Sequence, residues 1–335
     1  MKDMNLVYVS CLTYNHAPYI KDALDGFCMQ QTNFPFVCGI IDDASTDGEP
    51  DVIKQYLELN FDLDNPKVVK WEETDDYLRV FAQHKTNKNC FFAVVFLKYN
   101  HYQINKSKLT YVSEWRDNAK YIAFCEGDDY WLSPQKLQKQ ADVLDAHQEL
   151  DMCACEAVIL QDGRNIGKMA PYNDERTILV EDVITGGGSF LSTNTLFYRP
   201  SIFSSNVVSS TRHYPIDYFM QIDGALRGGI YYIPICMAAY RRFTLNSWTS
   251  KMKGNSRAVY THKYRVLSTL FLLDCETNKT LTKSIEKVVN SNVFTMFEIG
   301  LEGGFFKKQL STLSYLSKVK LSLKIAKFLL FQRIR

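Results

Sequence analysis

Residues 121–131 read Tyr-Ile-Ala-Phe-Cys-Glu-Gly-Asp-Asp-Tyr-Trp, an apolar run that ends in three carboxylates within four residues. The apolar part is typical of a buried strand in an α/β sheet, and such sheets bind ligands beyond the carboxyl ends of their strands. Carboxylates gathered there repel one another unless a cation or a hydrogen-bond network holds them. We expect Mn²⁺ or Mg²⁺, which prefer carboxylate and phosphate oxygens. A solvated acidic turn that caps the following helix is the alternative.

The composition indicates a folded α/β protein with a basic tail. The chain has 335 residues, of which 46% are hydrophobic and 13% aromatic, enough for a full core and about two domains. Residues 305–335 contain eight Lys or Arg and no acidic residue, whereas the rest carries 31 basic and 37 acidic residues, a net charge of −6. This tail suits an anionic membrane surface, or else a packed helical cover or a dimer contact.

The cysteines and the amino terminus indicate a cellular compartment. The nine cysteines form no C-x-x-C pair and lie mostly in apolar runs, which favours free thiols in a reducing compartment over disulfides or a zinc site. No signal peptide is apparent, and no apolar run approaches the ~18 residues that a membrane span needs. We expect a cytoplasmic protein, or one that touches the inner face of a membrane through residues 305–335.

Apolar runs and helical patterns alternate along the first half of the chain, which predicts a doubly wound sheet. Strands are expected at 6–12, 36–41, 67–71, 90–97, 119–125, 153–160, 194–199 and 230–234. Helices are expected at about 17–30, 51–59, 134–150 and 215–227, with Thr46 or Asp47 capping the second of them. The part beyond residue 256 is expected to be mostly helical.

Polar clusters follow three of these strands. The tripeptide Thr-Tyr-Asn at 13–15 offers a hydroxyl, an aromatic face and backbone amides that can hold a nucleobase, although a simple turn has the same pattern. The pair Asp-Asp at 42–43 can accept hydrogen bonds from a pyrimidine N–H or a ribose hydroxyl, or can belong to a capping loop. With the acidic stretch at 126–129, the sequence predicts three polar clusters along one sheet edge.

These three clusters together resemble, in order and spacing, the motifs of the family 2 glycosyltransferases, inverting enzymes of the GT-A fold. The resemblance covers about residues 5–250. It implies an α/β fold with a Rossmann-like mixed central sheet flanked by helices over 1–250, and a mostly helical extension with a basic tail over 251–335. It also implies sugar transfer from a nucleotide-sugar donor, with a UDP-sugar expected, to a hydroxyl of a glycan or lipid-linked glycan in polysaccharide biosynthesis, without a nucleic-acid partner.

The resemblance implies donor-binding roles for the residues of the first two clusters. Thr13 and Tyr14 would border the uracil or other base of the nucleotide, and Asn15 would belong to the same donor-binding cluster. Asp42 or Asp43 would bind the base or the ribose.

The resemblance assigns the cation, Mn²⁺ or Mg²⁺, to the third cluster. Asp128 matches the metal ligand. Glu126 stands where Asp is usual, and would face the ribose or bind the cation through water. Asp129 would orient the acceptor, or cap the following helix.

The resemblance also implies a general base on the acceptor side, because the attacking hydroxyl must lose its proton. The matching segment is 214–219, which makes Asp217 the predicted base. Asp217 can instead be a helix cap after Pro215, and Asp223 is a weaker rival for the catalytic role.

One segment departs from the family pattern. Phe243 stands where many relatives have a histidine near the metal or the phosphates. Either Arg241 or Arg242 would then supply positive charge to the diphosphate, or metal binding would be weaker. Both arginines can also belong to a solvated loop. Together with Glu126, this departure motivates a second hypothesis, a non-catalytic nucleotide-sugar-binding or scaffold subunit. Nucleotidyl transfer is a third hypothesis, but the chain lacks the Gly-rich phosphate loop that such enzymes carry near the first strand.

Overall fold

The structure is a computed structural model that describes residues 7–203, 209–244 and 247–303. The chain divides into two compact units, Met1–Ser205 with Met220–Ser247, and Asn206–Phe219 with Trp248–Arg335. The first unit contains the sheet, and the second consists of helices in its described part. The basic tail at 305–335 lies outside the described residues.

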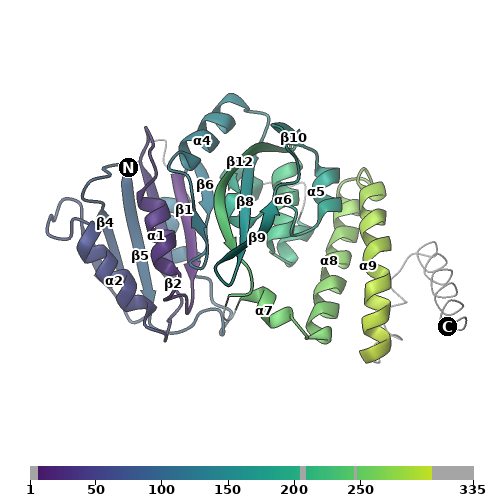
Figure 1. The fold of residues 1–335 in the computed structure, drawn as a ribbon, viewed down its shortest axis with the longest axis horizontal. Coiled ribbons are helices and arrows are strands. Elements are labelled where there is room, and N and C mark those ends of the chain that lie inside the picture. The colour runs from purple at the N-terminus through teal and green to yellow at the C-terminus, as the bar shows by residue number, and fades with distance from the viewer. Residues whose placement is uncertain (1–6, 204–208, 245–246, 304–335) are drawn as a thin grey trace, which may run out of the picture. The chain divides into compact units, whose positions relative to one another are not determined.

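The described part of the first unit contains one mixed sheet of twelve strands (Figure 1). The strands are β1 (Val7–Thr13), β2 (Phe36–Asp42), β3 (Lys70–Glu73), β4 (Tyr77–Gln83), β5 (Cys90–Leu97), β6 (Tyr121–Phe124), β7 (Tyr130–Trp131), β8 (Met152–Gln161), β9 (Arg164–Met169), β10 (Arg176–Ile178), β11 (Phe197–Tyr198) and β12 (Ile230–Arg241).

The sheet order explains why the motifs meet. The main path runs β10-β12-β8-β11-β6-β1-β2-β5-β4-β3, and its central strands β6, β1, β2 and β5 are parallel. Every residue of β2 is buried, as expected for a parallel strand covered on both faces. Thr13 pairs with Asp42, and Asp42 with Phe96, so these carboxyl ends share one edge. β11 runs antiparallel between β6 and β8 and joins the two halves of the sheet.

Helices of two kinds complete the described chain. The α-helices are α1 (Ile20–Cys28), α2 (Glu49–Asn60), α3 (Ser113–Arg116), α4 (Lys136–Ala146), α5 (Val180–Gly186), α6 (Asp217–Ala225), α7 (Trp248–Met252), α8 (Ser256–Glu276) and α9 (Thr282–Gly303). Short 3₁₀ helices are η1 (Leu109–Val112), η2 (Thr193–Thr195), η3 (Pro200–Phe203) and η4 (Ser210–His213).

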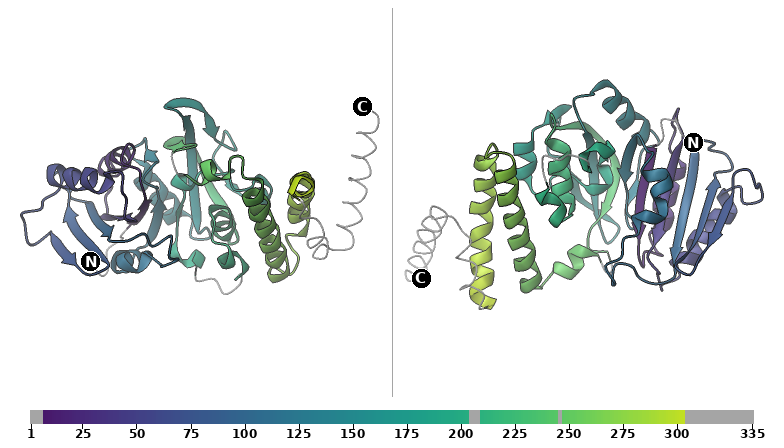
Figure 2. Two further views of the ribbon diagram at one scale, coloured as in Figure 1. Left: turned by 90° about the horizontal axis from the view of Figure 1, so that it is seen from below. Right: turned by 180° about the vertical axis from the view of Figure 1, so that it is seen from behind.

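Helices cover both faces of the parallel strands. Helices α1, α2 and α4 lie along one face of the strands (Figure 1). Their apolar sides form one core with strand residues, in which Phe27 meets the ring of Trp131 edge to face at 5.0 Å. The other face is seen from behind in the right view of Figure 2. On that face, Trp115 of α3 stacks on Phe81 of β4 at 5.1 Å. The predicted α/β fold with a mixed central sheet flanked by helices is therefore confirmed.

Several elements differ from the prediction; among them, the strand predicted at 194–199 is a 3₁₀ helix at Thr193–Thr195 followed by a strand at Phe197–Tyr198. The strand predicted at 67–71 begins only at Lys70, because Lys67–Val69 belong to a turn in which the Val68 and Val69 amides donate to Asn65 O. β4 was not predicted, because the stretch before it is charged. The predicted helix 134–150 ends at Ala146, where His147 takes a non-helical backbone conformation (φ −117°, ψ 79°).

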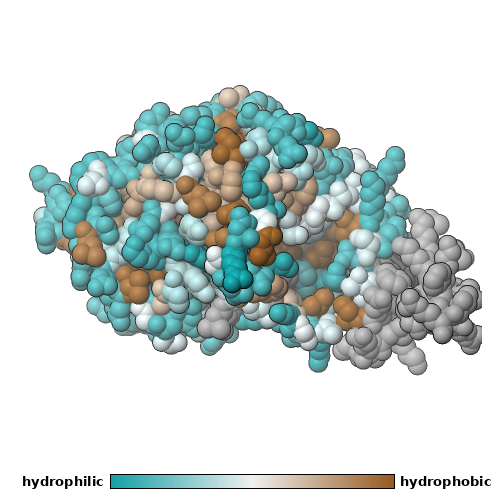
Figure 3. Space-filling view, viewed as in Figure 1, coloured by the Kyte–Doolittle hydropathy of each residue, from teal (hydrophilic) through white to brown (hydrophobic). Residues whose placement is uncertain are grey.

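The described part of the second unit is built on α8 and α9. Asn255 caps α8 by accepting a hydrogen bond from the Ala258 amide at 3.0 Å. Glu276, at the other end of α8, accepts hydrogen bonds from the Ser209 and Ser210 hydroxyls at 2.7 Å. Within 7–203, 209–244 and 247–303, no helix has the length and apolar character to cross a membrane. On the face in Figure 3, hydrophobic residues form separate patches among hydrophilic ones.

Candidate active site

Backbone hydrogen bonds join the carboxyl end of β1 to the two neighbouring polar loops. The Asp43 amide donates to Thr13 O at 3.0 Å, and the Gly127 amide donates to Leu12 O at 3.1 Å. The three clusters predicted to share one sheet edge therefore lie side by side around Thr13.

The turn after β1 and the loop after β2 form one hydrogen-bonded structure. Asn15 takes the left-handed conformation (φ 58°), which Asn tolerates better than most residues. Its amide donates to Ser45 Oγ at 2.8 Å, and its Oδ1 accepts from the Thr46 amide at 2.8 Å. Tyr14 is half-buried beside it. Asn15 thus shapes the loops, a role that differs from direct contact with a base.

Glu49, which sequence analysis missed, lies fully buried beneath these loops. Its carboxylate accepts hydrogen bonds from the Thr13 hydroxyl, from the His16 amide at 2.9 Å and from Ser45 Oγ at 2.9 Å. Its position in the first turn of α2 also favours a negative charge. The N-cap position of α2 is Gly48 (φ 92°), one residue after Asp47, whose carboxylate accepts the Glu49 amide at 3.1 Å as a cap does.

Asp42 carries a buried carboxylate oxygen whose hydrogen-bonding capacity is not used by the described residues. Its Oδ2 accepts a hydrogen bond from the Ser45 amide at 3.3 Å, whereas its Oδ1 has no hydrogen-bond partner among the described residues. Burial raises the pKa of Asp42 to about 6, an effect that Glu49 increases and the Ser45 hydrogen bonds reduce. A ligand N–H would satisfy this oxygen and stabilise the charge.

Asp43 is already engaged by the protein. Its carboxylate accepts the amides of His101 at 2.7 Å and Tyr102 at 3.1 Å, and it pairs with the Lys108 ammonium. Its backbone O accepts Asn100 Nδ2 at 3.0 Å. Asp43 therefore holds residues 100–108 against the sheet edge, and Asp42 is the better placed of the two for a ligand.

The two aspartates of the acidic turn, which is the stretch at residues 126–129, have different surroundings. Asp128 Oδ2 accepts the Thr244 hydroxyl at 2.7 Å and lies 3.8 Å from His16 Nε2. Asp129 Oδ1 accepts the Arg241 amide at 2.7 Å, and burial, then the charge of Asp128, raises the pKa of Asp129 well above its usual value. Asp129 thus anchors the turn to the end of β12.

The donor set at Asp128 fits a hard divalent cation. A partly accessible carboxylate and a nearby ring nitrogen are available, with side-chain exposures of 12% for Asp128 and 14% for His16. In the part of the chain that the structure describes, no three His, Cys, Asp or Glu side chains gather as a ready-made metal cage. Mg²⁺ and Mn²⁺ sites often combine one or two carboxylates with water and substrate phosphates. Glu126 is exposed on the same turn.

Arg241 stabilises the acidic turn. Its guanidinium donates to Asp128 O at 2.8 Å and pairs with Asp22, and it lies 4.5 Å from the centre of the Tyr130 ring. Arg242 is exposed above the ring of Phe243, which is half-buried in a left-handed conformation (φ 61°). Of the two arginines, Arg241 lies at the predicted site.

The predicted base belongs to the other unit. Asp217 is the exposed first residue of α6, and the partial positive charge at this end of the helix stabilises its carboxylate. Asp223 is half-buried later in the same helix. The catalytic role of Asp217 stays a prediction.

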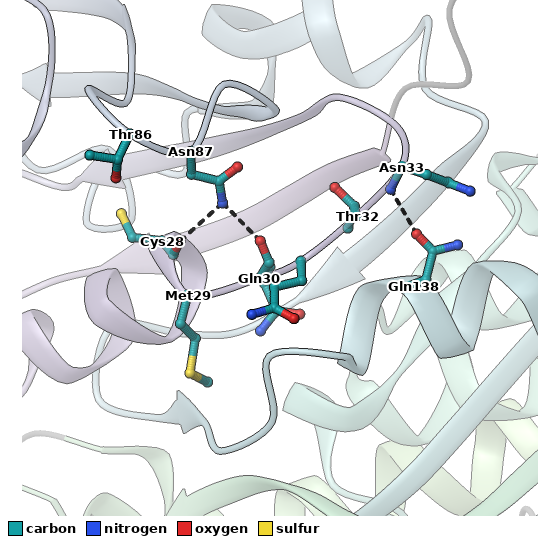
Figure 4. Close-up of a pocket in the computed structure, with 9 residues that line it drawn as sticks. Cys28, Met29, Gln30, Thr32, Asn33, Thr86, Asn87 and Gln138 are labelled. Carbon is teal, nitrogen blue, oxygen red and sulfur yellow. Dashed lines mark hydrogen bonds between the residues drawn. The ribbon is translucent and has the colours of Figure 1, made fainter.

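A surface pocket lies at the opposite edge of the sheet, at the amino ends of β2 and β5 (Figure 4). Asn87 crosses it and donates to Cys28 O at 3.1 Å and Gln30 O at 2.8 Å. Asn33 donates to Gln138 across its other end. Its lining contains none of the predicted site residues.

Comparison with known families agrees with this geometry. The profile of the family described as Glycosyl transferase family 2 matches residues 9–77, which include the first two clusters. The chain carries a glycosyl transferase family 2 domain. The predicted family is therefore confirmed.

Two curated relatives of this family 2 chain are the uncharacterized proteins Rv1520 of Mycobacterium tuberculosis (strain H37Rv) and Mb1547 of Mycobacterium bovis. Each is 30% identical over 268 residues, which is 80% of this chain and 66% of the relative. The chain thus spans about two thirds of the length of the relatives it matches.

Solved structures share the fold of this family 2 domain. Staphylococcus aureus TarS 1-349 in complex with UDP-GlcNAc matches with a TM-score of 0.53 at 13% identity, over 95% of this chain and 78% of that one. TarS 1-349 in complex with UDP matches with a TM-score of 0.52 at 12% identity, over 94% and 77%. The predicted GT-A fold is confirmed.

Proposed function

We propose that this family 2 glycosyltransferase moves a sugar, with inversion, from a UDP-sugar to a hydroxyl of a glycan or lipid-linked glycan acceptor in polysaccharide biosynthesis. The observation that carries the donor part is the unpaired buried Oδ1 of Asp42 at the carboxyl edge of the sheet. The imide N–H of uracil is a donor of the kind that this oxygen needs. Complexes of TarS with UDP-GlcNAc and with UDP support a uridine nucleotide as the first donor to test.

The residues of the sheet edge would divide the binding of the donor. Tyr14 and Asp42 would contact the base, while Thr13, Asn15 and Asp43 keep the surrounding loops in place. Asp128 would hold Mn²⁺ or Mg²⁺, and Glu126 would face the ribose or the hydrated cation. When bound, the cation neutralises charge on the diphosphate leaving group.

The chemical step would depend on Asp217. We infer that its carboxylate accepts the proton of the acceptor hydroxyl as the hydroxyl oxygen attacks C1 of the sugar and the nucleoside diphosphate departs. Arg241 fixes the acidic turn, and so would keep the donor in line for this attack. With a lipid-linked acceptor, the enzyme would work at the inner face of the membrane, which the basic residues of 305–335 would favour.

A calorimetric titration with UDP, with and without Mn²⁺, tests the donor site. We expect metal-dependent binding to the wild type and loss of the metal dependence in Asp128→Ala. Asp174→Ala, at an exposed carboxylate paired with Arg176, is the control that should bind like the wild type. Binding of GDP or dTDP in place of UDP would change the assigned base, and binding of no nucleotide would contradict the donor site.

Turnover separates the enzyme from a non-catalytic binding or scaffold subunit. Release of UDP from a UDP-sugar in the presence of glycan acceptors is expected for the wild type. Asp217→Asn should bind UDP normally and lose transfer. Full transfer by this variant would overturn the assignment of Asp217, and Asp223→Asn then tests the rival base.

A further inference from the structure

His16 points a ring nitrogen at the acidic turn from the loop after β1. Its Nε2 lies 3.8 Å from Asp128 Oδ2, and both side chains are mostly buried. This separation is longer than a hydrogen bond, so the two groups approach one another without bonding directly.

The hydrogen bonds around the ring determine which nitrogen carries the proton. The Thr13 hydroxyl has a single hydrogen, and it donates this hydrogen to Glu49 Oε1. Toward His16 Nδ1, 3.2 Å away, Thr13 Oγ1 must therefore act as the acceptor. Nδ1 then carries a hydrogen, so in the neutral tautomer, which is the form that can bind a metal, Nε2 has its lone pair on the side of Asp128.

The position of the ring is fixed from two sides. Glu49 holds the Thr13 hydroxyl with one carboxylate oxygen and the His16 amide, at 2.9 Å, with the other. Metal-binding histidines are commonly oriented by a carboxylate or another acceptor at the ring nitrogen that does not bind the metal. Here Glu49 would act in this way on Nδ1 of His16, through the Thr13 hydroxyl. Asp128 is oriented in a similar way by the Thr244 hydroxyl at 2.7 Å.

When the ring is neutral, the Nε2 lone pair and the Asp128 carboxylate oxygen, 3.8 Å apart, repel each other unless a cation lies between them. Two ligands that are each about 2.1 Å from one ion stand roughly 3.0 Å apart at a right angle and about 4.2 Å apart on opposite sides. The observed separation falls inside that range. Imidazole nitrogen is a usual ligand of transition metals, whereas Mg²⁺ prefers oxygen alone.

We propose that His16 Nε2 is a second protein ligand, beside Asp128, of the divalent cation at the donor site, and that it makes this site favour Mn²⁺ over Mg²⁺. This inference rests on the proposed function. The remaining positions on the ion would be taken by diphosphate oxygens and water.

Pulsed electron paramagnetic resonance of Mn²⁺ tests the ligand directly. The full chain is loaded with Mn²⁺ and UDP, and the electron spin echo is examined for modulation by a bound imidazole nitrogen. We expect ¹⁴N modulation in the wild type and in His147→Gln, a control at a half-buried histidine paired with Glu149. We expect its loss in His16→Gln, with the Mn²⁺ to Mg²⁺ affinity ratio reduced about tenfold or more.

Isotope labelling keeps the test valid if His16→Gln fails to fold. Wild-type protein with ¹⁵N-histidine has unchanged contacts, and its modulation must shift to the ¹⁵N frequencies. Metal-dependent UDP binding without histidine modulation, or modulation that persists in folded His16→Gln, would overturn the role of His16 alone. Failure of the wild type to bind UDP and Mn²⁺ would overturn the proposed function as well.

Discussion

Gly127 and Thr13 are in such close contact that a Cβ atom on Gly127 would lie 2.0 Å from Thr13 Oγ1 and 2.6 Å from Thr13 Cβ. Thr13 is itself held by its hydrogen bond to Glu49. This contact joins the acidic turn to the end of β1, so the spacing between the proposed base-binding and cation-binding ends of the candidate site depends on a glycine.

Gly127→Ala should therefore damage the donor site. The added methyl group must displace either the acidic turn or Thr13, and overpacking of this kind costs about 1–3 kcal/mol of unfolding free energy. We expect UDP affinity in the presence of Mn²⁺ to fall at least tenfold in a calorimetric titration.

Gly163→Ala is the matched control for this change. Gly163 lies in the exposed turn between β8 and β9 with φ 74°, so alanine there adds backbone strain of about 1 kcal/mol but meets no neighbouring atom. Its UDP affinity should equal that of the wild type. Equal loss of affinity in both variants would mean that strain, and not the contact with Thr13, causes the effect.

Asp42→Asn should stabilise the protein at neutral pH. Burial raises the pKa of Asp42 to about 6, so the folded state binds the proton more tightly than the unfolded state, and the ionised carboxylate lowers the unfolding free energy at pH 7. The gain in Asp42→Asn should be about 1–3 kcal/mol at pH 7, shrink as the pH falls below 6, and vanish below about pH 4.

Urea unfolding of the wild type and of Asp42→Asn at pH 7 and pH 4 measures this difference. Identical unfolding free energies at pH 7 would contradict the assignment of an unsatisfied buried carboxylate to Asp42. UDP should bind Asp42→Asn more weakly despite its greater stability, because a neutral amide oxygen is a weaker acceptor than a carboxylate.

Asp43→Ala should release residues 100–108 from the sheet edge. The Lys108 ammonium and the amides of His101 and Tyr102 would lose their common acceptor, and breaking such a buried pair costs about 3–5 kcal/mol. Hydrogen exchange at both amides should accelerate strongly. In Glu73→Ala, which removes an exposed pair with Lys98, these amides should exchange as in the wild type.

Arg241→Lys should weaken donor binding while the fold is retained. A lysine keeps the charge but lacks the planar fork that reaches both Asp22 and Asp128 O. We expect UDP–Mn²⁺ affinity to fall about tenfold, whereas Arg242→Lys, at an exposed arginine, should bind as the wild type does. Unchanged affinity in Arg241→Lys would mean that the acidic turn keeps its place without the guanidinium.

The first half of the fold follows from sequence patterns because its elements are regular. The buried runs of β1 and β2 and the apolar sides of α1 and α2 each have a clear period, and their order determines a parallel sheet. β4 escapes such reasoning because it is a partly exposed antiparallel strand that follows a charged loop. β11 has only two residues, too few for any period.

The positions of the candidate site residues could be predicted from the sequence only where a motif follows the end of a strand. Thr13, Asp42 and Asp128 belong to such motifs and lie together as expected. Glu49 resembles an ordinary acidic residue in a first helical turn, and Lys108 comes from a polar stretch without a period. Their roles arise from contacts between segments 36 and 65 residues apart, which local patterns do not encode.

β11 has a consequence for how the protein is made. Its two residues, Phe197 and Tyr198, pair with β6 on one side and β8 on the other. A ribosome completes β6 at residue 124, so that strand must wait as an open edge until residue 198 has been added. At about 5–20 residues per second this interval lasts roughly 4–15 s. During synthesis, the newly formed amino-terminal half therefore presents an unpaired strand to the crowded cell, and a chaperone that covers β6 would protect the chain from aggregation.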